Sequence, residues 1–288
     1  MGIRTAKVAV SLAVLLGGPG TTGGQASREP GTALSMQLVS GYLIVVEGSI
    51  GGLHGLRFLV DTGVTRSVID RRIADKMALP RWTASLINFD KAVEVESCQV
   101  PEISFGAEHA ANLKMTVADL GYLGASGLRI DAVVGWDLLG RKSFRLDFDK
   151  KLVIFEPREH RGSRFAPVRP NDLFLMVETC VDGTPVWMVA DTGAQGVTFY
   201  QERLGSVGAR YTVRGDAIGQ SLGGRINARV ADVSRLRLGA QDLDRTVQLI
   251  HAPLTGAPEG IAGYLGFAAL NAKEIDFNLE KKEIRWVN

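Results

Sequence analysis

The tripeptide Asp-Thr-Gly occurs twice, at the end of residues 58–63 (FLVDTG) and at the end of residues 187–193 (WMVADTG). In both places it follows an apolar run that is typical of a buried strand. One copy is weak evidence, because so short a motif arises by chance in many chains. Two copies in matching contexts indicate a pair of carboxylates, which can activate water without a metal or a cofactor.

The repetition extends well beyond the tripeptide. Gly135 follows Asp61 by 74 residues, and Gly266 follows Asp191 by 75 residues, each inside an apolar run. Three further landmarks recur in the same order: apolar-Gly runs at 103–106 and 236–239, Asp-Phe pairs at 147–148 and 276–277, and Lys-Lys pairs at 150–151 and 281–282. A repeat this long predicts two tandem lobes rather than a solenoid, whose units measure roughly 20–50 residues.

The chain of 288 residues has room for two domains that each bury a core. Its net charge of +2 is too small to favour nucleic acid as a partner. Turn-bounded apolar segments dominate, so we expect an all-β fold with a lobe over residues 36–156 and a second lobe over 171–288. The charged, Pro-containing segment 157–170 is expected to link them.

Helix signals are sparse. Ser67 is a possible cap for a helix over residues 67–78, where Ile69, Ile73 and Met77 have helical spacing and Pro80 follows. A second short helix is expected over residues 136–139, directly after the first distal glycine.

Residues 1–26 are typical of a secretory signal peptide. Arg4 and Lys7 precede a short apolar core, and small residues lead to a plausible cleavage site at Ala26. The alternative is a disordered or anchoring tail. The apolar core is too short to span a bilayer comfortably, so we expect no stable membrane span and a protein exported to the periplasm or the extracellular space.

Cysteine and histidine do not indicate a metal site. Cys98 and Cys180, one in each lobe, could form a disulfide in an oxidising compartment or remain free thiols. The four histidines are scattered without the spacing of metal ligands. We therefore expect neither a metal nor a cofactor.

Together these motifs resemble the aspartic peptidase superfamily, and specifically retropepsin-like lobes fused in tandem, as in bacterial-type exported aspartyl proteases. The resemblance covers the chain from about residue 36. It implies two closed β lobes related by a pseudo-twofold axis, with Asp61 and Asp191 forming a catalytic dyad within one polypeptide. It also implies that Thr62 and Thr192 hydrogen-bond across the lobe interface, and that the protein is a monomeric endopeptidase acting on polypeptides.

The two glycines of the tripeptides, Gly63 and Gly193, suit a sharp turn and a close backbone approach. In pepsin-type lobes a Ser or Thr usually follows that glycine, and its hydroxyl can lower the pKa of the dyad. Val64 and Ala194 stand there instead. We therefore expect the dyad to keep its shared proton more readily, with activity extending to about pH 5–7.

A flap that closes over substrate is expected in the glycine-rich segment 214–224, with Gly219, Gln220 and Ser221 as tentative substrate-binding residues. The corresponding region of lobe 1, residues 85–93, contains no glycine. This difference predicts that the lobes cover the cleft unequally. An ordinary surface hairpin is an alternative for either segment.

Three alternatives to an internal dyad remain open. Residues 219–223 (GQSLG) match the serine-hydrolase elbow, with His251 as a possible base, but that motif requires a buried strand before it and a helix after it. A catalytically inactive, secreted β-rich binding protein would keep the architecture without the activity. Finally, the dyad could form between two chains.

Overall fold

The computed structural model of the chain describes residues 8–9, 32–88, 91–123, 129–171, 173–221, 224–251 and 260–288. Apart from Val8 and Ala9, which form the short strand β1 (Val8–Ala9), the expected signal peptide lies outside these residues. Within the described ranges, no helix is both long enough and apolar enough to cross a lipid bilayer.

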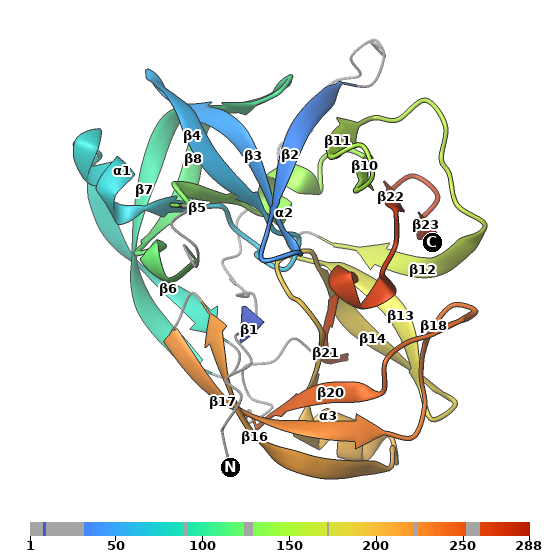
Figure 1. Cartoon of the computed structure of the whole chain (residues 1–288). Helices are drawn as coiled ribbons and strands as arrows, with labels where there is room; N and C mark the ends of the chain where they lie inside the picture. Colours follow the sequence, from blue (N-terminus) through green and yellow to red (C-terminus); the bar gives the residue numbers. More distant parts are fainter. Residues whose placement is uncertain are drawn as a thin grey trace.

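Two β lobes follow one another along the chain, as expected, and in Figure 1 lobe 1 occupies the upper left and lobe 2 the lower right of the molecule. The strands of lobe 1 are β3 (Leu43–Ile50), β4 (Leu53–Val60), β5 (Val68–Asp70), β6 (Arg81–Asn88), β7 (Lys91–Phe105), β8 (Glu108–Ala118) and β9 (Ala132–Val134). Those of lobe 2 are β13 (Leu175–Val181), β14 (Thr184–Asp191), β15 (Val197–Tyr200), β16 (Tyr211–Ser221), β17 (Gly224–Val233), β18 (Leu236–Leu238), β19 (Gln241–Asp242), β20 (Thr246–Ile250) and β21 (Ile261–Gly266). The helices are short: α1 (Arg71–Lys76), η1 (Gly121–Leu123), α2 (Trp136–Leu139), α3 (Gln201–Ser206) and η2 (Phe267–Leu270).

A shared antiparallel sheet joins the lobes. Its strands are β2 (Ala33–Val39), β10 (Phe144–Asp147), β11 (Leu152–Phe155), β12 (Arg164–Pro170), β22 (Glu274–Asn278) and β23 (Glu283–Val287). They lie in the order β2–β11–β10–β22–β23–β12, so each lobe supplies one half of the sheet. The outer strands β2 and β12 continue into the lobes, where they pair with β3 and β13. The segment expected as a linker, 157–170, therefore contains a strand of this sheet.

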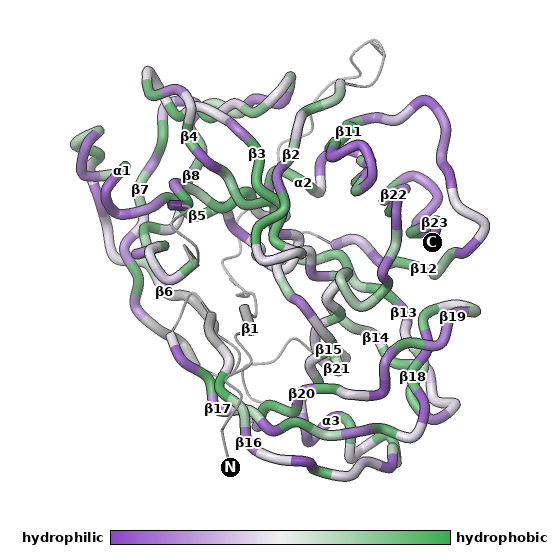
Figure 2. The backbone as a smooth tube through the Cα atoms, viewed as in Figure 1, coloured by the Kyte–Doolittle hydropathy of each residue, from purple (hydrophilic) through white to green (hydrophobic). Residues whose placement is uncertain are grey.

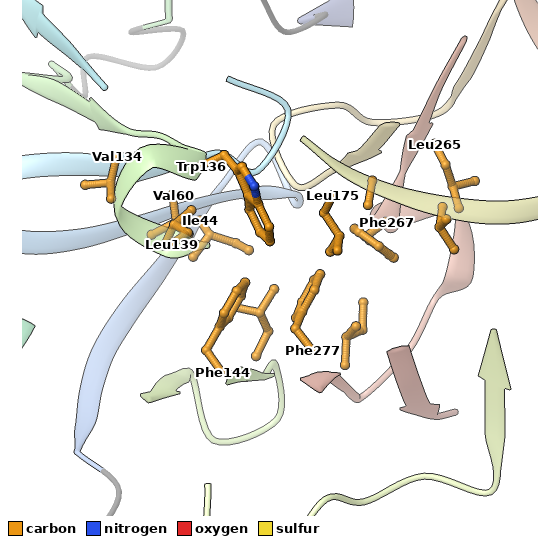
Figure 3. Close-up of a cluster of buried hydrophobic side chains, with 14 of the residues drawn as sticks. Ile44, Val60, Val134, Trp136, Leu139, Phe144, Leu175, Leu265, Phe267 and Phe277 are labelled. Atoms are coloured by element: carbon orange, nitrogen blue, oxygen red, sulfur yellow. The ribbon is translucent and has the colours of Figure 1, made fainter. Parts of the chain in front are cut away.

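The hydrophobic core continues from one lobe to the other across the shared sheet. Phe144 of β10 stacks on Phe277 of β22 with ring centroids 4.3 Å apart, and Phe267 meets the Phe277 ring edge-on at 5.2 Å (Figure 3). Trp136 and Leu175 pack in the same cluster. Figure 2 shows the contrasting hydrophilic connection between β11 and β12 on the outside. Aromatic burial at the centre thus stabilises the docking of the two lobes.

The Lys-Lys turns that follow β10 and β22 show how the two repeats correspond. The Asp147 carboxylate accepts a hydrogen bond from the backbone N–H of Lys150 at 2.8 Å, and the Asn278 side chain accepts the same bond from Lys281 at 3.0 Å. Asp147 therefore corresponds to Asn278, so the expected match between the two Asp-Phe pairs is wrong by two residues. The turn requires a short side chain whose oxygen accepts a hydrogen bond from the backbone N–H three residues later. The amide oxygen of Asn serves this purpose as well as the carboxylate of Asp.

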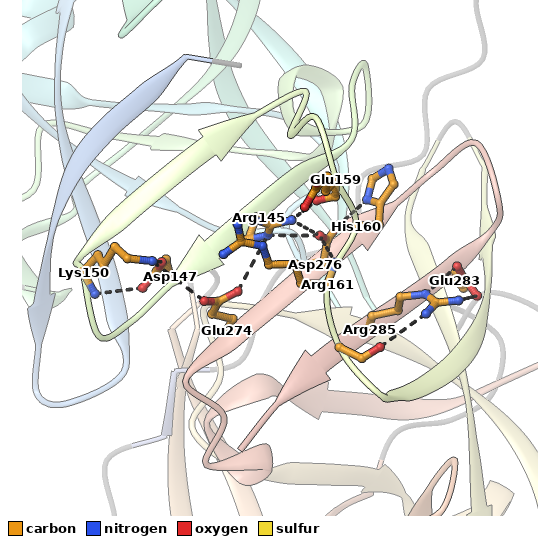
Figure 4. A network of polar contacts seen from close by, with 11 residues as sticks. Arg145, Asp147, Lys150, Glu159, His160, Arg161, Glu274, Asp276, Glu283 and Arg285 are labelled. Carbon is orange, nitrogen blue, oxygen red and sulfur yellow. Dashed lines mark hydrogen bonds and ion pairs between the residues drawn. The ribbon is translucent and has the colours of Figure 1, made fainter. Parts of the chain in front are cut away.

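With this corrected register, Arg145 of lobe 1 and Asp276 of lobe 2 occupy equivalent positions, and they face each other directly across β10 and β22. Both are buried, at 5% and 1% exposure. Asp276 accepts hydrogen bonds from Arg145 Nη2 at 2.8 Å and from the backbone N–H of Arg161 at 3.1 Å, and His160 Nδ1 lies 2.6 Å from its other oxygen (Figure 4). Two identical lobes would place like charges opposite each other here, whereas the fused chain places opposite charges.

The expected helix over residues 67–78 is wrong at its start. Val68 and Ile69 belong to strand β5, and the helix α1 begins only at Arg71. Its N-cap is Asp70, which accepts a hydrogen bond from the N–H of Arg72 at 3.0 Å. Strand pairing of β5 with both β8 and β9 buries the β-branched side chains fully, which overrides their helical spacing. The short helix over residues 136–139 is confirmed.

Removing one partner of the central ion pair should destabilise the protein strongly. We expect Arg145→Leu to lower the free energy of unfolding by about 3–5 kcal/mol, because the Asp276 charge remains buried without its main partner. The double variant Arg145→Leu/Asp276→Leu should recover much of this loss. Urea unfolding followed by tryptophan fluorescence measures both. As a control, Arg214→Ala removes an exposed pair with Asp232 and should change little; an equal effect of Arg214→Ala and Arg145→Leu would contradict the assignment.

Candidate active site

Each Asp-Thr-Gly loop leaves the carboxyl end of a buried strand. Asp61 follows β4, and Asp191 is the last residue of β14. The parallel neighbours β9 and β21 hold these strand ends: the N–H of Asp61 donates to the Val134 carbonyl at 3.0 Å, and Asp191 is in register with Gly266. The equivalent pairings fix the start of both loops in the same way.

The distal glycines lie directly beneath these loops. A Cβ on Gly135 would come within 2.7 Å of the Val64 carbonyl oxygen, and a Cβ on Gly266 within 2.5 Å of the Ala194 carbonyl oxygen. The backbone of the strand therefore touches the backbone of the loop, which any side chain would prevent. This close approach explains why a glycine about 75 residues after each aspartate accompanies the tripeptide.

The two loops are joined by reciprocal hydrogen bonds between the lobes. The N–H of Thr62 donates to Thr192 Oγ1 at 3.0 Å, and the N–H of Thr192 donates to Thr62 Oγ1 at 3.1 Å. Each hydroxyl in turn donates to a carbonyl of the other lobe: Thr62 Oγ1 to Ala190 at 2.7 Å, and Thr192 Oγ1 to Val60 at 2.9 Å. Because all four groups are buried and satisfied, the relative position of the loops is tightly constrained.

The aspartate carboxylates lie at this junction and are almost fully buried, with 6% exposure for Asp61 and none for Asp191. Asp61 Oδ1 accepts the N–H of Gly63 at 2.9 Å, and Asp191 Oδ1 accepts the N–H of Gly193 at 2.8 Å. A Cβ on Gly193 would lie 2.8 Å from Asp61 Oδ1 and closer still to Oδ2. The carboxylate of lobe 1 thus lies against the loop that carries the aspartate of lobe 2.

Val64 and Ala194, which follow the two tripeptides, are both buried. Their side chains bring no hydroxyl to the carboxylates, and the hydroxyls of Thr62 and Thr192 already donate to backbone carbonyls. Neither pair therefore provides the hydroxyl donor that a Ser or Thr after the glycine would supply.

A polar network that sequence reasoning missed supports the first loop. Ser67 donates to Asp137 Oδ1 through its hydroxyl at 2.7 Å and through its N–H at 3.0 Å, while its Oγ accepts the N–H of Gly135 at 3.0 Å. Burial raises the pKa of Asp137, and the hydrogen bonds from Ser67 oppose that effect. The equivalent positions of lobe 2 hold Val197 and Ala268, so this network exists in one lobe only.

Both lobes extend a long hairpin. In lobe 2 the tentative flap residues Gly219 to Ser221 end β16, and they pair with residues 224–226 of β17. In lobe 1 residues 85–88 and 91–93 of the glycine-free region belong to the antiparallel strands β6 and β7, where Asn88 pairs with Lys91, and residues 89–90 lie outside the described residues. The difference in glycine content therefore does not remove the hairpin from lobe 1, because alternating β residues pair without glycine.

The edge of β16 that faces away from β17 can accept a further extended segment. Strand β1 pairs with it in parallel, with Val8 opposite Gly219 and Ala9 opposite Gln220. In Figure 1, β1 is drawn between the hairpin and the interior of the molecule. Two of the three tentative flap residues thus take part in main-chain pairing with an extended stretch of polypeptide.

The serine-hydrolase alternative is wrong. Ser221 is the last residue of β16, and the next element is the antiparallel strand β17, which begins at Gly224, rather than the helix that the motif requires. Leu222 and Gly223 lie outside the described residues. His251, the possible base, contacts the Glu202 carboxylate through Nδ1.

The two cysteines are not bridged. Cys98 is fully buried in lobe 1, and Cys180 lies in lobe 2; both are free thiols. Burial raises the pKa of Cys98 to about 11, with a smaller opposing effect of Arg81, so this thiol stays protonated and unreactive at neutral pH. Among the residues that the structure describes, no group of three or more His, Cys, Asp or Glu side chains could hold a metal ion.

Comparison with known families agrees with this arrangement. The family described as aspartyl protease matches the chain twice, over residues 46–138 and 177–269. Each match contains one Asp-Thr-Gly loop and its distal glycine. No curated protein matches the chain. The chain belongs to the aspartyl protease family and consists of two retropepsin-like lobes in tandem.

The buried Asp137 predicts a pH-dependent difference in stability. Because the pKa of Asp137 is raised in the folded protein, the protonated side chain contributes most to the free energy of unfolding below the unfolded-state pKa of about 4. This contribution is lost as the pH rises through the pKa of Asp137 in the folded protein. In Asp137→Asn the amide oxygen can still accept the bonds from Ser67. We therefore expect the variant to gain stability relative to the wild type as the pH rises from about 4 to 7, measured by urea unfolding. Parallel stability curves for the two proteins would contradict this.

Proposed function

We propose that this protein is an aspartic endopeptidase that hydrolyses peptide bonds with water activated between Asp61 and Asp191. The observation that carries the proposal is the set of reciprocal Thr62–Thr192 hydrogen bonds, which join the two aspartate loops within one chain. The position of Gly193 against the Asp61 carboxylate adds to it. Membership of the aspartyl protease family agrees with this reaction class.

The proposed reaction needs one proton shared by the dyad. Two neighbouring buried carboxylates cannot both ionise without a large electrostatic cost, so one remains protonated. The ionised carboxylate takes a proton from a water molecule while the oxygen of that water attacks the peptide carbonyl carbon. The protonated carboxyl group donates its proton to the carbonyl oxygen. The carboxyl group that took the proton from water then donates it to the nitrogen, the other carboxylate takes a proton back from a hydroxyl of the tetrahedral intermediate, and the C–N bond breaks. No covalent link to the enzyme forms.

The backbone around the dyad orients the carboxylates for this work. Gly63 and Gly193 each donate an N–H to Oδ1 of the nearby aspartate, which fixes the orientation of each carboxylate. Hydrogen bonds to the ionised form favour it and so oppose the effect of burial on the pKa. The threonine bonds keep the two loops from moving apart during the reaction.

The proposed substrate is an extended polypeptide. The β16 edge at Gly219 and Gln220 pairs with an extended segment of this chain, and main-chain pairing of this kind is independent of side-chain identity. We assign Gly219, Gln220 and Ser221 to a flap over the substrate. This role requires a backbone that can accept a strand, which the pairing with β1 supports.

The proposal also includes the organisation and location of the protein. Residues 1–26 would act as a signal peptide and export the chain to the periplasm or the extracellular space. The lobes would span residues 36–156 and 171–288, and the protein would act as a monomer, because both aspartates come from one chain. Specific activity that is constant on dilution would support the monomer.

Replacing either aspartate should abolish cleavage. We expect Asp61→Asn and Asp191→Asn each to lower the hydrolysis of an unfolded polypeptide by at least about 10³-fold, because the dyad then lacks its proton acceptor or donor. Assays between pH 3 and 8, with and without a pepstatin-like inhibitor, measure this. Asp149→Asn, on an exposed turn, is the matched control and should retain activity.

Cleavage by either dyad variant at the wild-type rate would contradict the proposed function. Binding of peptide by the wild type without any cleavage would identify an inactive binding protein instead. The same pH series tests the expectation that activity extends to about pH 5–7, and a maximum below about pH 3 would contradict it.

Adding one methyl group at either of two glycines of the second loop should show whether the contact between Gly193 and the Asp61 carboxylate matters for the reaction. Gly193→Ala places a Cβ on the Asp61 carboxylate, so we expect kcat to fall by about 100-fold or more as the carboxylate is displaced. Gly196→Ala in the same loop meets no atom within 4 Å and should leave kcat unchanged. Equal activity of the two variants would show that the Asp61 carboxylate does not work in the observed position.

A further inference from the structure

A tyrosine hydroxyl lies on the side of the lobe 2 sheet that carries Asp191. In the parallel pairing of β14 with β21, Asp191 is in register with Gly266 and Val189 with Tyr264. Residues in register on neighbouring strands point to the same face, and residues two apart lie about 7 Å from each other along the strand. A tyrosine side chain can span that distance, so Tyr264 can reach the Asp191 carboxylate.

The Tyr264 side chain is held in place from several directions. It is 1% exposed, and its hydroxyl lies 3.4 Å from that of Tyr200, which is fully buried. Their rings meet edge-on at 6.1 Å. At Gly263, which has a φ of 157°, a Cβ would overlap the Thr198 carbonyl, so this extra glycine permits the close packing of β15 on β21.

The surroundings of these hydroxyls are apolar. Phe174, Val189 and Ile261 belong to the same buried cluster as Tyr200 and Tyr264. Buried hydroxyls in such surroundings require hydrogen-bond partners, and electrostatic interactions there are strengthened by the low local dielectric. A hydroxyl aimed at a carboxylate from this cluster would therefore have a larger effect than one at the surface.

The pKa of Tyr264 reflects both its burial and the nearby carboxylates. Burial is the main cause that raises its pKa well above the usual value, followed by Tyr200, Asp191 and Asp61. The phenol therefore remains a neutral donor throughout the pH range of protein stability, and it is close enough to sense both carboxylates. Across the junction, Tyr122 of η1 has its pKa raised by burial and then by Asp61.

The other titratable groups on the elements packed against β21 are few. Strand β14 contributes Asp191, β15 ends at Tyr200, and α3 carries Glu202 and Arg203. Glu202 is engaged by His251. In lobe 1 the position equivalent to Tyr264 is Val133, so the strand beside the first aspartate carries no phenol at this position.

We propose that Tyr264, whose hydroxyl lies 3.4 Å from that of Tyr200, is a positioning residue that turns its hydroxyl to the Asp191 carboxylate when that group is ionised, donates a hydrogen bond to it and so stabilises the ionised form. It supplies from the neighbouring strand the hydroxyl that Val64 and Ala194 do not supply. This inference rests on the proposed function only where it concerns the rate of peptide hydrolysis; the titration of the dyad does not depend on it.

The test is a titration of the dyad in the full chain. Carbonyl-labelled aspartate, followed by ¹³C NMR, reports the macroscopic pKa values of the pair without any need for cleavage. We expect Tyr264→Phe to raise the lower of these values by about one unit, the equivalent of one hydrogen bond to a charged group. The acid limb of the kcat/KM profile should move upward by the same amount.

The direction follows from the state that the hydroxyl binds. A donor to the ionised carboxylate lowers its pKa, so removal of the donor raises it. Tyr200→Phe keeps Tyr264 but removes its hydroxyl partner, and should cause a smaller shift in the same direction. Tyr211 is the first residue of β16, at the other end of the strand from Ser221, so Tyr211→Phe is the control and should cause no shift in these pKa values.

The outcomes separate the two proposals. A Tyr264→Phe protein that loses stability while both the NMR titration and the acid limb stay unchanged would show that the tyrosine only packs, and would overturn this inference. A wild-type protein that cleaves no peptide would overturn the proposed function, whereas a shifted NMR titration in the same sample would still support the hydrogen bond from Tyr264.

Discussion

The reciprocal hydrogen bonds between Thr62 and Thr192 are the contact on which the site depends. Each threonine gives one N–H and one hydroxyl to the opposite lobe, and all of these groups are buried. Breaking one bond would leave a buried polar group unsatisfied at a cost of about 1–3 kcal/mol. The carboxylates of Asp61 and Asp191 are thus positioned by lobe docking, which in turn requires the shared sheet and its aromatic core.

Fusion of the two lobes in one chain allows each to differ where a symmetric dimer could not. Arg145 and Asp276 occupy equivalent positions and form a buried ion pair, although two copies of either lobe would place like charges there. The Ser67–Asp137 network supports only the first loop. Tyr264 lies on β21, which pairs with the strand that leads into the second loop. The proposed dyad therefore has different surroundings on its two sides, and we expect unequal proton affinities for the carboxylates of Asp61 and Asp191.

The parts of the fold that were predicted incorrectly have two physical origins. Val68 and Ile69 have helical spacing, but pairing with two neighbouring strands places them in β5. Asp147 and Asp276 match as letters, yet the turn hydrogen bond makes Asn278 the true counterpart of Asp147. In the first case the deciding contacts join residues far apart in the chain, which a local pattern does not contain. In the second case the match depends on hydrogen-bonding capacity, which Asn and Asp share, rather than on residue identity.

The sequence by itself determined the two lobes, the two aspartate loops and their distal glycines. These features are readable because a glycine is required wherever backbone touches backbone, as Gly135 and Gly266 do beneath the loops. Only the tertiary structure decided which lobe 2 groups meet the Asp61 carboxylate, and that Tyr264 shares a sheet face with Asp191. Such contacts arise from strand register and lobe docking, which bring together residues 73 positions apart (Asp191 and Tyr264) and 132 positions apart (Asp61 and Gly193).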